Sequence, residues 1–360
     1  MPVKVRLLSK FSRFGASSRL RMLQYVPHLS HLGVTVDHRP LLSDMYVRAL
    51  FAGSRYRSRT LAMVGYANRI AELQTSAAYD LDWIEGELLP FVPRIIEKVL
   101  AWRRRPFVVE YDDALFHRYG LSASAVVRTA LGRKIGAVMR EATYVIAGND
   151  YLAEYARRAG AERIAIVPTV VDAARYVPRA HCNRGRLVIG WIGSPVTQHY
   201  LYELRDVLRE ICARHGAVVM LVGASPDAAK HLVGVPLDCV AWSEHNEPDL
   251  VAAMDVGIMP LLDGPWERGK CGYKLVQYMA CGLPVVASPV GVNPDLVESG
   301  VTGFLPSDLG EWVNALSSLL GDAATRTRMG EAGRLRVERE LCVDVQAPRL
   351  ASIMHEVAGR

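Results

Sequence analysis

The sequence lacks any long hydrophobic run. None of its 360 residues lies in a stretch that approaches the roughly 18 to 20 consecutive apolar residues needed to cross a bilayer. The N-terminus, MPVKVRLLSKF, is too polar and too short for a secretory signal. We therefore expect a cytoplasmic protein without a transmembrane helix.

Cysteines at metal-binding spacing are also missing. The six cysteines include no Cys-x-x-Cys pair, and most lie in apolar or helical contexts. Such cysteines are typical of free, buried thiols. The sequence thus predicts free thiols and no bound metal.

No dinucleotide-binding fingerprint is present. Two glycine turns follow apolar runs, at Gly190-x-x-Gly193 and at Gly15, but neither forms G-x-G-x-x-G. This absence argues against a dinucleotide-dependent oxidoreductase.

The composition, 50% hydrophobic and 22% charged, is typical of a folded protein and argues against disorder.

Positive charge is concentrated in the first half. Residues 1–172 contain 25 Lys and Arg against 16 Asp and Glu, whereas residues 173–360 contain 18 against 21. The clusters Arg55-Tyr56-Arg57-Ser58-Arg59 and Trp102-Arg103-Arg104-Arg105 mix cations with aromatic rings. Such clusters suit an anionic membrane surface, a lipid diphosphate or nucleic acid, and they also occur as solvated faces. Of these partners we favour the membrane surface and expect no nucleic acid.

Short apolar runs alternate with helical patterns along the chain. This alternation is typical of parallel sheets with helices on both faces, and 360 residues suggest about two domains. The sequence therefore predicts an α/β protein with two Rossmann-like domains. Strand-like runs occur at 3–8, 34–38, 81–84, 107–111, 143–147, 163–167, 187–192, 218–222, 238–241, 256–259, 285–287 and 303–305. Helical patterns in the first half occur at 18–32, 92–102, 125–140 and 151–159.

A linker candidate separates the two series of strands. It runs from Pro168 to Gly185 and ends in a polar stretch that begins at His181. We expect one domain at 1–172 and a second at 173–342. The tail, 343–360, has helical periodicity, which predicts a C-terminal helix.

Two lysines mark a candidate phosphate site. Lys270 and Lys274 are four residues apart at the start of a predicted helix, 273–280. Both side chains can face one way there, beside free backbone donors and the positive end of the helix dipole. A diphosphate suits this site.

The segment after this helix adds polar residues. A glycine stop with a proline just beyond ends the helix, and 285–287 reads as a strand buried on both faces. Gly291, Asn293 and Asp295 then fall on a loop at the carboxyl end of that strand, where open α/β sheets bind ligands.

Two glycine loops and a tryptophan suit ligand contacts as well. Gly193 and Ser194 follow the first strand of the second half, and the glycine lets the backbone approach a phosphate. Gly15 opens a matching loop in the first half, where Ser17 or Ser18 can cap a helix. Trp242 follows the strand at 238–241 and suits either a ligand contact or the core. Each loop also fits an ordinary strand-to-helix turn.

Acidic side chains and a histidine follow the strand at 107–111. Asp112, Asp113 and His117 lie at its carboxyl end, and adjacent acids so near an apolar strand favour a site. The two aspartates point to opposite faces if the strand continues, which argues against joint metal chelation. Glu85 and Glu87, after the strand at 81–84, alternate to one face; they suit a place lining the cleft, but a solvated strand end is the favoured interpretation.

The segment from Gly269 to Gly303 resembles the donor-binding segment of GT-B glycosyltransferases, which use nucleotide-sugars, and is closest to the retaining family 4. That family usually carries two glutamates eight positions apart, where this chain has Gly269 and Gln277. Gln277 can still hydrogen-bond ribose hydroxyls, and Glu267 can substitute if its loop bends inward. The matching positions are Lys274-Leu275, Met279-Ala280, Gly282, Pro284 to Ser288, Gly291, Pro294-Asp295, Val297, Gly300 and Gly303.

The resemblance implies two Rossmann-like domains facing across a cleft, with the C-terminal helix crossing back to the first. It implies a retaining, metal-independent transferase without a cofactor, in which the second domain holds the nucleotide-sugar and the first a glycan or lipid-linked acceptor. Asp113 or His117 would orient or deprotonate the acceptor hydroxyl, and Lys274 would neutralise the leaving diphosphate. Cell-surface polysaccharide or glycolipid synthesis at the inner membrane face fits this function. The implied donor-binding residues are Gly15, Gly193, Ser194, Trp242, Lys270, Lys274, Gln277, Gly291, Asn293 and Asp295.

Two other functions remain open. A catalytically silent relative that binds a glycan or a partner subunit is favoured by the loss of the paired glutamates at Gly269 and Gln277. An epimerase or phosphorylase can also use a double Rossmann scaffold. The epimerase would need paired acids and histidines, and the phosphorylase a pyridoxal-anchoring lysine and a longer chain; neither pattern is evident.

Overall fold

The computed structural model describes residues 2–74, 78–100, 105–178 and 185–359, which form two compact units. Unit 1 comprises Met1–Thr169 together with Val343–Arg360, and unit 2 comprises Val170–Cys342. The chain passes from unit 1 to unit 2 after Thr169, whereas the predicted domain boundary lies after residue 172. Most of the predicted linker's polar stretch lies outside the described residues.

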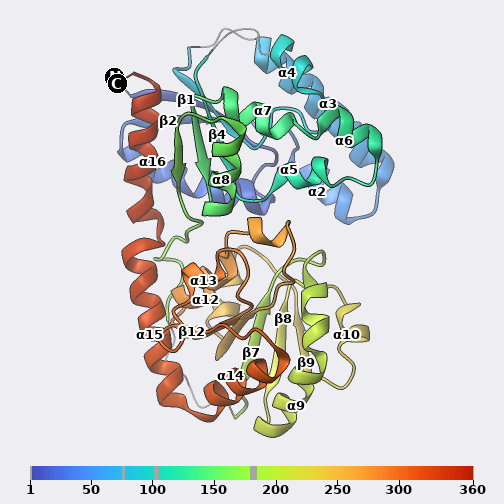
Figure 1. The fold of residues 1–360 in the computed structure, drawn as a ribbon, viewed down its shortest axis with the longest axis vertical. Helices are drawn as coiled ribbons and strands as arrows, with labels where there is room; N and C mark the ends of the chain where they lie inside the picture. Colours follow the sequence, from blue (N-terminus) through green and yellow to red (C-terminus); the bar gives the residue numbers. More distant parts are fainter. Residues whose placement is uncertain (1, 75–77, 101–104, 179–184, 360) are drawn as a thin grey trace. The chain divides into compact units, whose positions relative to one another are not determined.

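Unit 1 contains a six-stranded parallel sheet in the order β2-β1-β3-β4-β5-β6 (Figure 1). Every strand predicted for the first half is confirmed to within one residue at each end. Buried aliphatic side chains explain the agreement for β1, β3, β4 and β5, which are mostly buried, whereas only Val34 is buried in the edge strand β2. The strands are β1 (Val3–Leu8), β2 (Val34–His38), β3 (Leu81–Glu85), β4 (Phe107–Tyr111), β5 (Tyr144–Ala147) and β6 (Ile164–Ile166).

The helices of unit 1 differ more from the predictions. The pattern at 18–32 is not one helix, because Pro27 can only sit in the first turn of a new one. The pattern at 125–140 divides in two at Gly132–Arg133. The segments are η1 (Ser18–Met22), η2 (Leu23–Tyr25), α1 (Val26–His31), α2 (Asp44–Phe51), α3 (Arg55–Gln74), α4 (Arg94–Leu100), α5 (Leu115–Gly120), α6 (Ala125–Leu131), α7 (Lys134–Glu141) and α8 (Asp150–Ala159).

The C-terminal helix α16 (Val343–Val357) belongs to unit 1, although the residues before it belong to unit 2. It packs against α1 and β2. His28 Nδ1 lies 3.1 Å from Asp344 Oδ1, and His355 Nε2 lies 3.0 Å from the Leu32 carbonyl oxygen. No helix in the described part of the chain is long and apolar enough to cross a membrane.

Unit 2 contains a second six-stranded parallel sheet in the order β12-β11-β10-β7-β8-β9. Both faces of this sheet are covered by buried clusters of apolar side chains. Each predicted strand of the second half is confirmed within one residue. The strands are β7 (Val188–Ile192), β8 (Val218–Val222), β9 (Leu237–Val240), β10 (Val256–Met259), β11 (Val285–Ala287) and β12 (Gly303–Phe304).

The helix predicted at 273–280 is confirmed as α12 (Tyr273–Ala280). Every residue of α12 from Leu275 to its end is buried, which explains its clear apolar signal. The other helical segments of unit 2 are η3 (Gln198–Leu204), α9 (Arg205–His215), α10 (Ala228–His231), α11 (Glu247–Val251), η4 (Glu267–Gly269), α13 (Asn293–Leu296), α14 (Leu309–Gly321) and α15 (Ala323–Glu340).

A buried ion cluster stabilises the helical side of unit 1. The Lys134 ammonium lies 2.6 Å from Glu87 Oε2 and 2.9 Å from Glu97 Oε1, and all three side chains are almost fully buried. Tyr119 also donates a hydrogen bond to Glu87. The interpretation of Glu87 as a solvated strand end is therefore wrong, because a lysine distant in sequence neutralises it.

Replacing Lys134 with alanine is expected to lower the free energy of unfolding by about 3–5 kcal/mol, because Glu87 would stay buried without a counter-charge and Glu97 would keep only its ion pair with Arg94. Urea unfolding followed by circular dichroism measures the loss. Lys230→Ala removes an exposed lysine that pairs with Asp227 at 2.6 Å, and should leave the unfolding free energy almost unchanged. Similar small effects for both variants would contradict this account.

Candidate active site

The Lys274 ammonium lies over a buried tryptophan of unit 2. Lys274 is the second residue of α12, and its Nζ is 4.8 Å from the ring centroid of Trp191, a fully buried residue of β7. The Lys274 ammonium group makes no hydrogen bond or ion pair within the described residues. Cation–π attraction holds this charge in place without neutralising it.

A second cation lies close to Lys274. Burial and then the charge of Lys270 lower the pKa of Lys274 to about 7. The two ammonium groups therefore approach each other, as the sequence spacing suggests, but not on one helix. Lys270 has an extended backbone before α12, which begins at Tyr273, so the prediction that both lie at the helix start is wrong for Lys270. An anion bound between them would relieve their repulsion.

Gln277 is part of a chain of buried hydrogen bonds. Its Nε2 donates to the Tyr176 hydroxyl at 3.0 Å, and that hydroxyl donates to Glu247 Oε1 at 2.5 Å. The indole N–H of Trp242 donates to the other oxygen of Glu247 at 2.6 Å. Gln277 is only 2% exposed, so its amide nitrogen is committed to Tyr176. Trp242 stays half-buried, and its indole N–H is fixed by the same carboxylate.

The segment after β11 is short and helical rather than a loop. Asn293 and Asp295 lie in α13, with Asp295 exposed. Asn293 is 1% exposed, its Nδ2 donates to the Ser288 carbonyl at 3.0 Å, and its Oδ1 is buried without a partner in the described part of the chain. An unpaired buried acceptor costs about 1–3 kcal/mol, which a ligand or water donor would recover.

Close packing explains two of the glycines that were predicted to bind the donor. Gly291 has a φ of +59°, and a Cβ there would lie 3.0 Å from the Arg268 carbonyl oxygen, so the glycine lets α13 pack onto η4. A Cβ at Gly193 would lie 2.5 Å from the Trp191 ring. Ser194, beside it, is exposed. Glu267, the alternative acid, accepts a hydrogen bond from Tyr200 at 2.5 Å.

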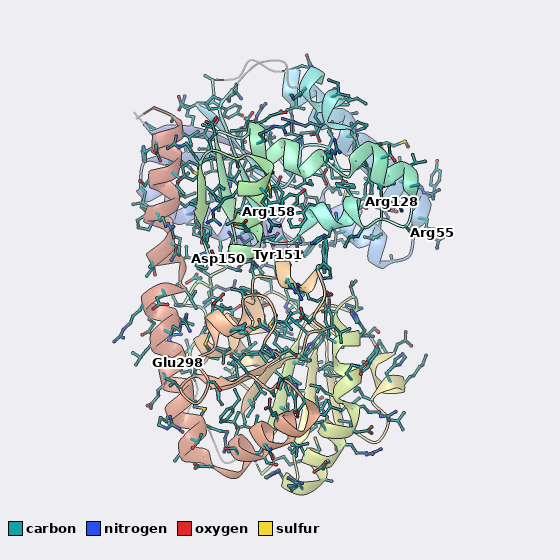
Figure 2. All side chains as sticks on the ribbon, in the orientation of Figure 1. Arg55, Arg128, Asp150, Tyr151, Arg158 and Glu298 are labelled. Carbon is teal, nitrogen blue, oxygen red and sulfur yellow. The ribbon has the colours of Figure 1, made fainter. Side chains whose placement is uncertain are left out.

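In unit 1, His117 and Asp113 lie where β4 ends. His117 Nε2 is 2.8 Å from the hydroxyl of Tyr151, which Figure 2 labels beside Asp150, and burial lowers the pKa of the imidazole. Asp113 is half-buried just before α5. Because β4 ends at Tyr111, the predicted alternation of the two aspartates along a strand does not apply.

Glu85, for which the sequence favours a solvated strand end over a place lining the cleft, is held by hydrogen bonds in the structure. It is half-buried at the end of β3, where its Oε2 accepts hydrogen bonds from Ser18 Oγ at 2.6 Å and from the Lys10 amide at 2.7 Å. Burial, with Asp112 adding to it, raises the pKa of Glu85 to about 7. Ser18 therefore does not cap a helix; it positions this carboxyl group.

Gly15 has a packing role in the same loop. A Cβ there would lie 2.3 Å from Phe11 Cβ, so glycine lets the loop close onto the phenyl side chain. Its predicted contact with the donor stays a prediction.

No group of three His, Cys, Asp or Glu side chains in the described ranges is arranged to hold a metal ion. The thiols of Cys212, Cys281 and Cys342 are free and buried, whereas Cys239 is exposed and Cys271 is half-buried. Cys182 lies outside the described residues.

Comparisons with known proteins agree with this geometry. The sequence model of the family described as glycosyl transferases group 1 matches residues 186–322. Sulfoquinovosyl transferase from Arabidopsis thaliana is 31% identical over 160 residues, which cover 42% of this chain and 29% of that protein. The chain therefore spans under a third of the length of this relative.

Two solved structures resemble nearly the whole chain. Sucrose-phosphate synthase from Thermosynechococcus elongatus has a TM-score of 0.71 at 17% identity and covers 99% of both chains. Anabaena HepE, solved with UDP-glucose, has a TM-score of 0.69 at 19% identity and covers 98% of this chain and 99% of its own. Both resemblances establish the fold. The chain therefore has the GT-B fold, and residues 186–322 match the glycosyl transferases group 1 family.

The geometry shows which of the predicted site residues lie together. In unit 2, Lys270 and Lys274 come together, and Gln277 and Trp242 are linked through Tyr176 and Glu247. The donor-binding and catalytic roles given to the predicted residues remain predictions. Sequence reasoning missed Tyr176 and Glu247, because nothing in their local patterns signals a contact with α12. For Glu85, the sequence did contain a signal of a possible ligand contact, namely a carboxylate at the end of a central strand.

Binding of uridine, guanosine or adenosine diphosphate should depend on the charge of Lys274. With its pKa at about 7, Lys274 is half protonated in the empty protein at pH 7, and a bound anion raises that pKa. Binding should therefore take up protons and weaken between pH 7 and 9, where the diphosphate is already ionised. Calorimetry in buffers of different ionisation enthalpy measures both effects.

Lys274→Met should weaken binding about 10- to 100-fold at pH 7 and remove most of the proton uptake, since hydrogen bonds to charged groups contribute about 1.5–3 kcal/mol. Lys230→Met is the matched control, because Lys230 is exposed and pairs with Asp227. Unchanged affinity in Lys274→Met would show that the diphosphate does not bind against this ammonium group.

Proposed function

We propose that this chain transfers a sugar from a nucleotide-sugar to an acceptor hydroxyl, with unit 2 holding the donor. The paired cations Lys270 and Lys274 carry the proposal, because the diphosphate that joins the nucleoside to the sugar in a nucleotide-sugar is the anion that such a pair attracts. The GT-B fold supports it, and HepE, which shares that fold, was solved with UDP-glucose.

The same cations supply the electrostatics of the reaction. As the bond from the sugar to the diphosphate breaks, negative charge develops on the leaving phosphate. Two ammonium groups in a partly buried site stabilise that charge more than water does. We infer that the reaction proceeds without a metal ion and without a cofactor. The resemblance of the segment from Gly269 to Gly303 to the retaining family supports transfer with retention at the anomeric carbon.

Unit 1 would hold the acceptor. Asp113 and His117 lie at the end of β4, and burial keeps His117 largely neutral at pH 7, so its imidazole can accept a proton. Synthesis of a cell-surface polysaccharide or glycolipid fits an acceptor held by this basic unit, whether that acceptor is a glycan or is linked to a lipid.

A basic face of unit 1 suits an anionic membrane surface. In Figure 1, α2 to α6 gather on the side of unit 1 away from α16. Arg55 on α3 and Arg128 on α6, both labelled in Figure 2, lie on that side. Tyr56 is 86% exposed and Val126 is 77% exposed on the same two helices. Cations beside exposed apolar side chains are the usual composition of a peripheral membrane contact. In the second predicted basic cluster, Trp102 to Arg104 lie outside the described residues.

One observation favours a catalytically silent relative as the second candidate. Gly269 offers no side chain, Gln277 donates its amide to Tyr176, and Glu267 accepts from Tyr200. Neither Gly269 nor Gln277 therefore presents a carboxylate to a ribose, and Glu267 keeps only its Oε2 without a hydrogen bond in the described part of the chain. Such a protein would bind nucleotide-sugars without turning them over.

Incubation with UDP-glucose, GDP-mannose and ADP-glucose distinguishes the two candidates. An active enzyme should release nucleoside diphosphate slowly from one donor even without an acceptor. Lys274→Met should reduce that release at least about tenfold, because the leaving charge is no longer stabilised. Lys230→Met should retain full release. Tight donor binding with no release, across a panel of glycan and lipid acceptors, would reject the enzyme and support the silent relative.

Sedimentation with vesicles tests the membrane contact. The triple variant Arg55→Glu, Arg57→Glu, Arg59→Glu should lose roughly a hundredfold in affinity for phosphatidylserine vesicles, since each arginine near the surface contributes about 1 kcal/mol. A triple reversal of exposed arginines in unit 2, at Arg205, Arg209 and Arg339, should change little. Equal losses in both variants, or binding to neutral vesicles alone, would contradict a specific basic face.

A further inference from the structure

A second cluster of charged side chains lies at one edge of the sheet in unit 1. Lys10 follows β1, Glu85 ends β3, and Arg118 lies on α5, shortly after β4. These three strands are neighbours in the order β1-β3-β4 and run parallel. Their carboxyl ends therefore bring the three side chains to the same edge, where parallel sheets bind ligands.

Hydrogen bonds fix both the N–H and the carbonyl group of Lys10. Its N–H donates to Glu85 Oε2 at 2.7 Å, and its carbonyl accepts from the Leu42 amide at 2.9 Å. The next amide, of Phe11, donates to Ser18 Oγ at 3.1 Å. The Lys10 side chain thus extends from a fixed base, which lowers the entropic cost of holding a ligand.

The Lys10 ammonium is incompletely neutralised. It is half-buried, lies 5.0 Å from the ring centroid of Phe11, and makes no ion pair or side-chain hydrogen bond within the described residues. Burial and then the charge of Arg118 lower the pKa of Lys10, while the charges of Glu85, Glu87 and Asp112 act in the opposite direction. The charge of Arg118 therefore reaches the Lys10 ammonium, and an anion bound beside Lys10 would offset the repulsion between the two cations.

Glu85 can hydrogen-bond a hydroxyl group of the same ligand. Both of its hydrogen bonds go to Oε2, so Oε1 has no partner in the part of the chain that the structure describes. Its pKa of about 7 means that the group is often protonated at neutral pH. A carboxyl group in that state repels a nearby anion less than a carboxylate does, and it can both donate to and accept from a hydroxyl.

We propose that Lys10, Arg118 and Glu85 form a subsite for an acceptor that carries a phosphate monoester. The phosphate lies against Lys10 and Arg118, and a hydroxyl of the same molecule hydrogen-bonds Glu85 Oε1. This subsite names the acceptor class and rests on the proposed transferase function. The phosphate can belong to a free sugar phosphate or to a polyprenyl phosphate in a membrane, and both present the same chemistry.

Two binding experiments on the full chain separate these sources. Calorimetry compares glucose 6-phosphate with glucose. Sedimentation compares phosphatidylcholine vesicles that contain undecaprenyl phosphate with vesicles that contain the same fraction of phosphatidylserine. In each experiment Lys10→Met is compared with Lys4→Met, which removes an exposed lysine from the same strand region, and with Lys10→Arg, which restores the charge.

The proposal predicts that the phosphate-bearing probe binds in at least one experiment, and that Lys10→Met weakens this binding about tenfold or more. Lys4→Met should match the unchanged protein, and Lys10→Arg should recover most of the affinity. Uridine diphosphate binding is measured in every variant, because it reports on unit 2. If the diphosphate binds but neither phosphate probe does, or if Lys10→Met and Lys4→Met bind alike, the subsite is refuted and the proposed function stands. If the protein without substitutions does not bind uridine diphosphate, the proposed function is refuted instead.

Discussion

The ammonium group of Lys274, stacked on the buried ring of Trp191, is the interaction on which the functional account depends. The tryptophan belongs to the first strand of unit 2 and the lysine to α12, so the contact connects the sheet to the helix that follows β10. A π face holds a cation but leaves its charge uncompensated. The second cation, Lys270, increases that imbalance, and a pyrophosphate group is the ligand whose charge and size correct it best.

Unit 1 repeats the same physical situation with different residues. Lys10 is also half-buried beside a second cation and over an aromatic ring, and it also follows a strand of a parallel sheet. By contrast, Lys134 in the same unit has two carboxylates within ion-pair distance and is a structural residue. Lys134 is thus compensated within the protein, whereas Lys274 and Lys10 are the lysines for which we propose an anion as the missing partner.

The central strands were predicted well from the sequence because each is a short apolar run that is buried through its own residues, whereas the edge strands β2 and β9 are more exposed. The helix α12 and its glycine stop were predicted for the same reason. The path of the chain before α12 was not, because the left-handed backbone at Gly272 separates Lys270 from the helix. The contacts of Glu87 with Lys134, of Gln277 with Tyr176, and of Glu85 with Ser18 join residues far apart in sequence, and no local pattern encodes them.

The pKa of Lys274 tests the central claim most directly. Nuclear magnetic resonance of protein carrying isotope-labelled lysine, with the Lys274 signal assigned by its absence in Lys274→Arg, follows the titration of this one ammonium group. The account predicts a pKa of about 7 in the empty protein and a clear rise when a nucleoside diphosphate saturates the site. An ordinary lysine pKa in the empty protein, or a low pKa that a saturating diphosphate leaves unchanged, would contradict it.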